Sequence, residues 1–315
     1  MGGVSVDVFR VAATNIWGGE VSFTPSFVRL RRSLESPAEV FTGRFPVPAR
    51  PAELVRVQVF RNDEPIFEGK IDEQRLTLSS NGMLLQLDAR NRGGLLLDNE
   101  AMPETLAHPT THMMFERLIA RHGFTLIATP RSLPEFTIRK GLTLWDAFAV
   151  FARRTYGRLP YVVGDAVIVS GTDLGEGTLL LGGSGLPFSR LEHVISHQRM
   201  ISRIFIRDEE GYYRTFVDNP HTAGLGIVRE RFLIPSGEFA AIPRWDSASR
   251  IRRSMRQAIS VVAELPGFAH LRLGRGVAVD NPLVSLPNLM VDESVFTLDQ
   301  NGARTVLTLA NWLHD

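Results

Sequence analysis

The segment between residues 53 and 99 carries the pattern that most constrains how this chain can fold. In LVRVQVF, three valines alternate with polar residues (Val55, Val57 and Val59), and MLLQLDARN repeats the alternation. A period of two is typical of strands with one face on a core and the other in solvent. Asn81-Gly82 lies between two such runs, and both residues tolerate the positive φ that tight hairpins need. The segment is therefore predicted to be a β-meander or part of a small barrel, and it contains no obvious reactive group.

The rest of the N-terminal third has the same β character. Residues 4–11 alternate as a strand, and VSFTPSFVRLRRSL adds a second amphipathic extended run. Four prolines between residues 37 and 51 forbid a helix and suit an irregular edge segment. We therefore predict a first β-barrel domain over residues 1–100.

Residues 101–171 have a different, mixed pattern. Thr110-Thr111 can cap a helix through HMMFERLIARHG, and Thr143 can cap a second helix that Gly157 ends. The run FTLIATP between the helices reads as a strand, and YVVGDAVIVSG follows as a hairpin over Gly164-Asp165. This part is predicted to be a compact α/β module of helix, strand, helix and hairpin.

The remaining residues are predicted to be a linker followed by a second β-barrel domain. Residues 172–188 are the glycine-richest part of the chain and lack the lysine-serine pair of a phosphate-binding loop, so a linker is favoured. Residues 189–315 return to strand-like alternation. One long helix is predicted within them at about 246–264, capped by Ser247 and ended by Pro266-Gly267. The fold class is thus α+β, mainly β, with two similar barrels separated by the helical module.

The similarity of the two barrels rests on an internal repeat. Asn81-Gly82 recurs at an offset of 220 residues as Asn301-Gly302, with leucines and an asparagine following in step. The strands that precede the two turns correspond more loosely. The repeat predicts two copies of one small barrel, one at each end of the chain, although a match this short also arises by chance in β-rich proteins.

No residue pattern in the sequence predicts catalysis, a cofactor or a metal. His193 and His197 would suit a metal on a helix, but in a strand they would lie roughly 13 Å apart, and no third ligand is indicated. They are interpreted as surface or interface histidines. The acidic runs at Asp72-Glu73 and Asp208–Glu210 are interpreted as lying in turns or on solvent faces, where carboxylates need no functional explanation. We therefore predict no catalytic, cofactor-binding or metal site.

Composition excludes several classes of protein. The chain has no cysteine, which rules out disulfides and thiolate chemistry. No apolar run approaches the ~18–20 residues of a membrane-spanning helix, and no secretory signal is evident at the start. The net charge of +1 gives no overall positive field that would attract nucleic acid.

Two groups of side chains could serve interfaces. Four arginines cover one side of the helix predicted at 246–264 (Arg250, Arg252, Arg253 and Arg256), and a solvated or protein-facing role is favoured over phosphate binding. Tyr212-Tyr213 and Trp245 are candidate interface anchors, because aromatic residues are enriched in interfaces. Ordinary core positions would explain the same three aromatics.

The order of these features resembles the phage baseplate hub family, which includes the Mu-like hub protein and the late control protein D family. The resemblance is carried by Gly69-Lys70-Ile71-Asp72 after a short hairpin, by Leu96-Leu97-Asp98, and by the helix that leads through Gly157 into the YVVGDAVIV hairpin. It extends over most of the chain through short motifs, and residues 210–245 do not fit the pattern. The same architecture is similar to the hub part of the type VI secretion spike protein.

The resemblance implies a non-enzymatic virion component in the tail baseplate, made in the host cytoplasm. Its implied partners are two further copies of itself in a homotrimer, the tail tube protein, the central spike protein and other baseplate proteins. Two similar barrels per chain would give a trimer six similar surfaces under a six-fold tube and three-fold symmetry toward a spike. The alternatives are a tail-tip hub of a non-contractile phage, a hub of a type VI or other contractile injection machine, a tail-associated cell-wall hydrolase and a sugar-binding β-module.

Overall fold

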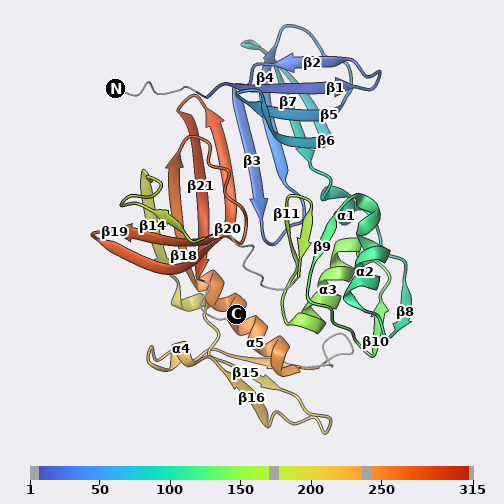
Figure 1. Cartoon of the computed structure of the whole chain (residues 1–315), viewed down its shortest axis with the longest axis vertical. Coiled ribbons are helices and arrows are strands. Elements are labelled where there is room, and N and C mark those ends of the chain that lie inside the picture. The colour runs from blue at the N-terminus through green and yellow to red at the C-terminus, as the bar shows by residue number, and fades with distance from the viewer. Residues whose placement is uncertain (1–6, 170–176, 236–242, 312–315) are drawn as a thin grey trace.

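A computed structural model describes residues 7–169, 177–235 and 243–311 of the chain (Figure 1). The fold is mainly β, and its largest feature is one thirteen-stranded sheet. A module of helices and short strands lies beside this sheet, and a small three-stranded sheet lies at the opposite end of the molecule from β1 and β2 (Figure 1). The predicted class, mainly β with helices, is confirmed.

The first seven strands form what we call the N-terminal β unit. They are antiparallel to their neighbours and surround a core that includes the fully buried Phe41, Phe45, Leu85 and Leu87. Their bounds are β1 (Phe9–Asn15), β2 (Glu20–Phe23), β3 (Phe27–Ser33), β4 (Val40–Val47), β5 (Leu54–Arg61), β6 (Glu64–Ser79) and β7 (Gly82–Arg90).

This unit differs from the sequence prediction at three places. The irregular edge segment predicted at 37–51 is wrong for residues 40–47, because they form β4 and pair with both β3 and β7. The other two differences are smaller. Val55 is 41% exposed, because the β1–β5 pairing shifts register beside it: Asn15 pairs with Leu54 and Thr14 with Arg56. Val55 is the extra residue of this bulge and points away from the core, which the strand meets again from Val57. The strand expected at residues 4–11 is observed as β1 from Phe9 onward, and residues 1–6 lie outside the described part of the chain.

Six strands from the second half of the chain form the C-terminal β unit. Their bounds are β13 (Leu179–Leu181), β14 (Arg190–Ile195), β18 (Ile259–Pro266), β19 (Gly276–Asn281), β20 (Val284–Asp299) and β21 (Gly302–Asn311). A separate hydrophobic core lies inside this unit and includes Val261, Val277, Val291, Leu307 and Leu309.

The linker predicted at 172–188 is wrong for its second half. Residues 179–181 form β13, which pairs in parallel with β19 and buries Leu181 completely. The glycines that suggested flexibility are needed for close packing: a Cβ on Gly182 would lie 2.5 Å from the carbonyl oxygen of Asp280. Residues 172–176 lie outside the described residues.

The helix predicted at 246–264 is also wrong at its C-terminal end. Helix α5 spans Pro243–Ala258, and the chain continues at once into β18. Val261, Ala263 and Leu265 are buried and alternate with less buried residues, so the period changes from 3.6 to 2 at Ile259. Pairing of β18 with both β14 and β21 favours the strand over the helix that the local spacing allowed.

The two β units hydrogen-bond into one continuous sheet. Strand β3 of the N-terminal unit pairs antiparallel with β20 of the C-terminal unit, from Val28↔Leu298 to Ser33↔Glu293. The order along the sheet is β14-β18-β21-β20-β3-β4-β7-β6-β5-β1-β2, with β19 beside β20 and β13 beside β19.

The helical module between the units has its own core, built on Phe148 and Phe151 of α3 against α2 and the short strands. Both predicted caps are confirmed, since the Thr110 and Thr143 side chains accept hydrogen bonds from Met113 N and Asp146 N. The module comprises α1 (Gly94–Asp98), β8 (Glu104–Ala107), α2 (Thr111–Leu118), η1 (Ala120–His122), β9 (Thr125–Ile127), β10 (Glu135–Ile138), α3 (Leu144–Tyr156), β11 (Tyr161–Val163) and β12 (Ala166–Ile168).

The described residues between 197 and 258, which include most of the segment that does not fit the resemblance, form a small sheet and the helix α5 on which it packs. Strand β15 lies in the middle, and Ile204, Ile206 and Leu233 pack with Ile251 of α5. The elements are η2 (His197–Arg199), β15 (Arg203–Ile206), β16 (Thr215–Asp218), α4 (Pro220–Ala223), β17 (Glu230–Leu233) and α5.

Candidate functional site

The residues considered for chemistry do not come together into a reactive centre. His193 lies on β14 and His197 on η2, and both are exposed. Within the three described ranges, no three His, Asp, Glu or Cys side chains are grouped so that they could hold a metal ion. The Asp208 carboxylate accepts a hydrogen bond of 2.7 Å from Tyr212 N and so stabilises its own turn.

The strongest organised feature is a repeat of five strands in one register. Strands β4, β5, β6 and β7 correspond to β18, β19, β20 and β21 at an offset of 220 residues: the pair Val40↔Arg90 corresponds to Ser260↔Ala310, and Val57↔Gly69 to Val277↔Leu289. Strand β3 corresponds to β14 at an offset of 163, because Val28↔Gly43 matches Leu191↔Ala263. The internal repeat seen at the two Asn-Gly turns is therefore present in the structure, and it is longer than the sequence indicated.

Each unit also carries the same β-bulge. The β6–β7 register shifts between Ile71 and Glu73, and the β20–β21 register shifts between Val291 and Glu293. The bulge residues are Asp72 and Asp292. A visible sequence signal was missed here, since Ile-Asp-Glu at 71–73 and Val-Asp-Glu at 291–293 both stand ten residues before an Asn-Gly turn.

Some of the strand edges that could join one unit to the next are paired, and others are free. In the pair of β3 with β20, Val28 and Phe296 are 0% and 3% exposed. The corresponding edges are those of β14 and of residues 73–78 of β6. Among the described residues, neither has a strand paired on its outer side. Both edges expose large apolar side chains: Leu78 is 77% exposed, Ile195 54% and Val194 40%.

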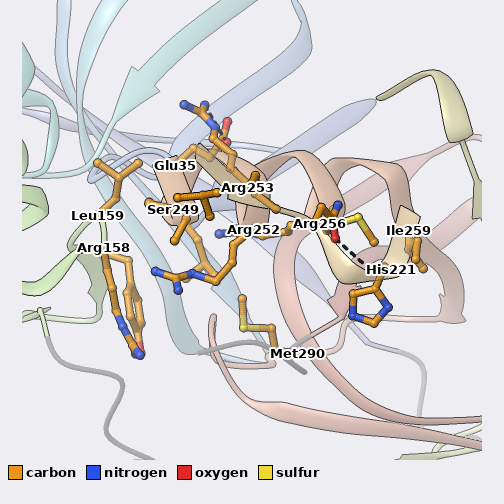
Figure 2. Close-up of a pocket in the computed structure, with 18 of the residues that line it drawn as sticks. Glu35, Arg158, Leu159, His221, Ser249, Arg252, Arg253, Arg256, Ile259 and Met290 are labelled. Atoms are coloured by element: carbon orange, nitrogen blue, oxygen red, sulfur yellow. Dashed lines mark hydrogen bonds and ion pairs between the residues drawn. The ribbon is translucent and has the colours of Figure 1, made fainter. Parts of the chain in front are cut away.

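A pocket of about 390 Å³ lies where α5 meets the helical module and the C-terminal β unit. Figure 2 shows that Arg252, Arg253 and Arg256 reach it from α5, while Arg158 comes from the segment after α3. Arg253 pairs with Glu35 at 3.1 Å, and Arg256 pairs with Asp292 at the bulge of β20.

The predicted arginine side of α5 is therefore only partly covered by the protein: Arg252 and Arg256 are half-buried, whereas Arg250 and Arg253 are exposed. Arg250 also pairs within the helix, with Asp246 at 2.9 Å. Ion pairs with Glu35 and Asp292 attach α5 to both β units, so these arginines act as structural anchors and need no phosphate to balance them.

The small sheet presents an aromatic surface formed by Phe205, Phe216, Phe232 and Tyr213. Phe205 stacks on Phe232 with centroids 5.3 Å apart, and Tyr213 meets Phe232 edge-on at 5.1 Å. Phe232 is nevertheless 62% exposed and Tyr212 57%. The predicted anchor Tyr213 thus belongs to an exposed aromatic surface, whereas Tyr212 is exposed beneath the Arg214 guanidinium. The Trp245 side chain lies outside the described residues.

A group of ionisable side chains lies at the joint between the β units. The Arg32 guanidinium lies 3.3 Å from the His270 ring, and both line a small pocket with Glu39 and Phe296. Burial raises the pKa of the Glu39 carboxyl and lowers the pKa of Arg32, with each charge opposing the shift of the other. Burial, together with the charges of Arg32 and Arg272, lowers the pKa of His270 to about 4.

Solved structures that share this fold include tail proteins. A tail protein from Neisseria meningitidis matches with a TM-score of 0.78 and 18% identity over 96% of this chain and 98% of that one. The 43 kDa tail protein of prophage MuSo2 from Shewanella oneidensis also has a TM-score of 0.78, with 14% identity over 97% and 98% of the two chains. The chain has the fold of a phage tail protein.

The tail-protein fold extends to a secretion machine. A component of the E. coli type VI secretion system, itself described as similar to bacteriophage T4 tail proteins, matches with a TM-score of 0.59 and 11% identity over 92% of this chain and 74% of that one. The resemblance inferred from short motifs is thereby confirmed at the level of the fold. No protein-family model matches the sequence, and neither does any curated protein.

The motifs that carried the resemblance have structural roles in the tail-protein fold. A Cβ on Gly69 would lie 2.6 Å from the Arg90 carbonyl oxygen, so the strand pair needs glycine there. Asp72 accepts hydrogen bonds of 2.7 and 2.9 Å from Arg90, which also donates to Asp98 of α1 at 2.9 Å. The two carboxylates raise the pKa of Arg90. Both motifs therefore join the N-terminal β unit to the helical module.

None of the helices in the described residues has both the length and the apolar character needed to cross a lipid bilayer.

Proposed function

We propose that this protein is a structural baseplate hub of a phage tail, a homotrimer that joins the six-fold tail tube to the three-fold central spike. In this proposal each β unit is one of two hub barrels: β1–β7 form the first, β13, β14 and β18–β21 form the second, and the helical module lies between them along the chain. The protein acts by presenting surfaces and is not an enzyme. It works in the virion tail and is made in the host cytoplasm.

The observation that carries the proposal is the repeat of five strands in one register. Three chains with two equivalent units each provide six equivalent positions around a three-fold axis. A ring of this kind matches six-fold symmetry on one side, while the parts of the chain that are not repeated keep three-fold symmetry. The small sheet on α5 has no second copy among the described residues, so its aromatic surface is suited to a three-fold partner such as the spike.

Exposed apolar side chains support binding of other proteins. Trp17, at the turn between β1 and β2, is 76% exposed and Ile16 is 48% exposed. Aromatic side chains are frequent anchors in interfaces, where their burial contributes most of the binding energy. We assign these side chains, with the aromatic surface of the small sheet, to contacts with the tube, the spike and other baseplate proteins.

Oligomeric mass tests the proposal directly. The purified chain should have three times the monomer mass in light scattering, alone or after co-expression with the products of the neighbouring tail genes, and it should bind tube and spike proteins in pull-down assays. A chain that stays monomeric under both conditions and binds neither protein would refute the hub assignment.

A hub of a type VI or other contractile injection machine is the second candidate. It is favoured by the structural similarity to the type VI secretion component of E. coli. A sheath gene beside this gene, without capsid genes, would support the injection machine, whereas capsid and tail genes together would support the phage.

A further inference from the structure

The free edges of β14 and β6 are copies of two edges that already pair inside the chain. Strand β14 corresponds to β3, and residues 73–78 of β6 correspond to residues 293–298 of β20. Since β3 and β20 pair antiparallel over six residue pairs, each chain contains one complete junction between units and the two separate halves of a second.

We propose that β14 of one copy pairs antiparallel with residues 73–78 of β6 in the next copy, in the register of the β3–β20 pair. This inference rests on the proposed hub and identifies the surface through which its subunits join. The two halves lie on opposite sides of the molecule, with β14 at the left of Figure 1 and β6 at the right, so one copy cannot pair them with each other.

The internal junction fixes which residues should meet. Glu293↔Ser33 and Leu298↔Val28 are the ends of the observed pairing. Applying the two offsets gives the intersubunit pairs Glu73↔Ser196, Gln74↔Ile195, Arg75↔Val194, Leu76↔His193, Thr77↔Glu192 and Leu78↔Leu191.

Burial at the two junctions supports this pairing. At the β3–β20 junction inside the chain, Ser294, Phe296 and Val28 are buried. At the two free edges, the counterparts Gln74, Leu76 and Leu191 are only half-buried. Leu78 is 77% exposed, whereas its counterpart Leu298 is half-buried. An edge strand that exposes apolar side chains and unpaired backbone groups is a template for pairing with another chain.

Charge at the free edges is complementary. Arg75 is paired with Glu73 two residues away on β6, and Glu192 with Arg190 on β14. In the proposed register Arg75 stands opposite Val194 and therefore diagonal to Glu192 on the same face, a position that long side chains reach. Arg75 of one copy and Glu192 of the next can therefore form an ion pair across the junction.

The contact is head-to-tail, because a copy offers β14 to one neighbour and β6 to the other. Head-to-tail contacts form a ring when the rotation closes and a filament when it does not. Internal and intersubunit junctions alternate, so three copies form six junctions of one type. Closure at three copies is the outcome that agrees with the hub.

The chain contains no cysteine, so disulfide trapping has no background. The test variant is the double substitution Thr77→Cys and Glu192→Cys, both at exposed positions. Cα atoms directly opposite each other in an antiparallel pair lie about 4.5–5.5 Å apart, within the range of about 4.4–6.8 Å that a disulfide spans. The matched control is Arg29→Cys with Thr297→Cys, the corresponding pair inside one chain.

Oxidation of the full-length test variant should give bands of two and three chains in a denaturing gel, and the matched control should give a bridge within one chain. Each single variant should stay at the mass of one chain or give at most a pair. A second register is probed with Thr77→Cys and Val194→Cys, which should trap far less. Light scattering of the same preparations reports the oligomeric mass.

The outcomes separate this inference from the proposed function. A trimer in light scattering without trapping at Thr77–Glu192, or with stronger trapping at Thr77–Val194, would overturn the strand pairing and leave the trimeric hub intact. A monomer in every preparation, including those with tube and spike proteins, would overturn both. A ladder that continues beyond three chains would support the strand pairing and contradict the closed ring.

Discussion

The N-terminal and C-terminal β units share five strands in one register, yet the same edge is buried in one copy and exposed in the other. Phe296 of β20 is 3% exposed and packs against Phe9 and Phe268, with ring centroids 5.1 and 5.0 Å away. Its counterpart Leu76 is half-buried on a strand with one free edge. The backbone of the repeat is therefore the same in both units, and the difference lies in whether a neighbouring strand covers it.

The units also differ at their other edge. Strand β5 is covered by β1, which is antiparallel and leads to the β1–β2 hairpin with the exposed Trp17. Its counterpart β19 is covered by the three-residue strand β13, which is parallel. Both strands of the β3–β20 junction thus have counterparts in the repeat, while the edges away from the junction have diverged, as expected if only the junctions must be equivalent.

The largest difference should appear when the two counterparts are truncated. Phe296→Ala is expected to lower the free energy of unfolding by about 3–5 kcal/mol, because it leaves a cavity at the centre of the junction. Leu76→Ala should cost about 1 kcal/mol in the monomeric chain, since half of that side chain is already in water. Denaturant unfolding monitored by circular dichroism measures both values. Equal losses would show that the two edges are in the same environment.

The bulge aspartates provide the second comparison. Asp292 accepts from Arg256 of α5, whereas Asp72 shares Arg90 with Asp98. Asp292→Asn should cost about 1.5–3 kcal/mol, the range for hydrogen bonds to a charged group. Asp72→Asn should cost less than about 1 kcal/mol, because Arg90 keeps its second carboxylate.

The double variant Asp72→Asn with Asp98→Asn removes that second partner. It should be destabilised by more than the sum of the two single variants, measured by thermal unfolding of all four chains. Additive losses would mean that Arg90 does not compensate between its two carboxylates.

Much of the fold could be predicted because local pattern and tertiary structure agree. The caps at Thr110 and Thr143 and the positive φ of Gly157 depend only on neighbouring residues, and the structure confirms them. The alternation at Leu85, Leu87 and Ala89 reports a core face directly, and all three are buried. Short-range chemistry was therefore sufficient for α2, α3 and the alternating strands of the first unit. It did not predict α1, β8 or β10, and it did not identify β4 as a strand.

The errors occur where distant strands decide the outcome. The apolar residues at 259–264 continue the helical spacing of α5, but this segment pairs with both β14 and β21 and therefore forms the strand β18. The glycines at 182–185 read as a linker, but they let the chain pass closely beside Asp280. The candidate site was missed for the same reason: an edge is defined by which strands pair with it, and the pairing of β3 with β20 joins residues about 265 positions apart.

The third comparison depends on pH, since the joint contains His270 and the N-terminal unit has Arg50 at the corresponding position. The pKa of His270 is lowered to about 4 by burial and by Arg32 and Arg272, whereas an unfolded histidine has a pKa near 6.5. The unfolded chain therefore binds this proton first as pH falls. Stability associated with His270 is complete above pH 6.5 and is lost between pH 6.5 and about 4.

His270→Gln removes this proton uptake. Because the ring is partly exposed, the loss in the unsubstituted protein should be at most about 1 kcal/mol. As the pH falls from 7 to 4.5, the free energy of unfolding of the variant should rise by that amount relative to the unsubstituted protein. Thermal unfolding at each pH measures this difference. Burial raises the pKa of Glu39, which gives the opposite dependence in both chains and cancels in the difference. A difference that does not change with pH would exclude His270 as its source.

The smallest effect on folding, and the sharpest test of the free edge, is expected at Leu78. Leu78→Lys should change the free energy of unfolding of the isolated chain by no more than about 0.5 kcal/mol, because the side chain is already in water. Its counterpart Leu298→Lys should cost about 1–3 kcal/mol, since Leu298 pairs with the fully buried Val28. If β6 joins the next copy, Leu78→Lys should also reduce the trimer fraction in light scattering at equal concentration, because the lysine would stand opposite Leu191 of the neighbour. A variant that folds and assembles like the unsubstituted protein would show that the exposed edge at Leu78 is not a subunit contact, and the two units would then differ in function as well as in burial.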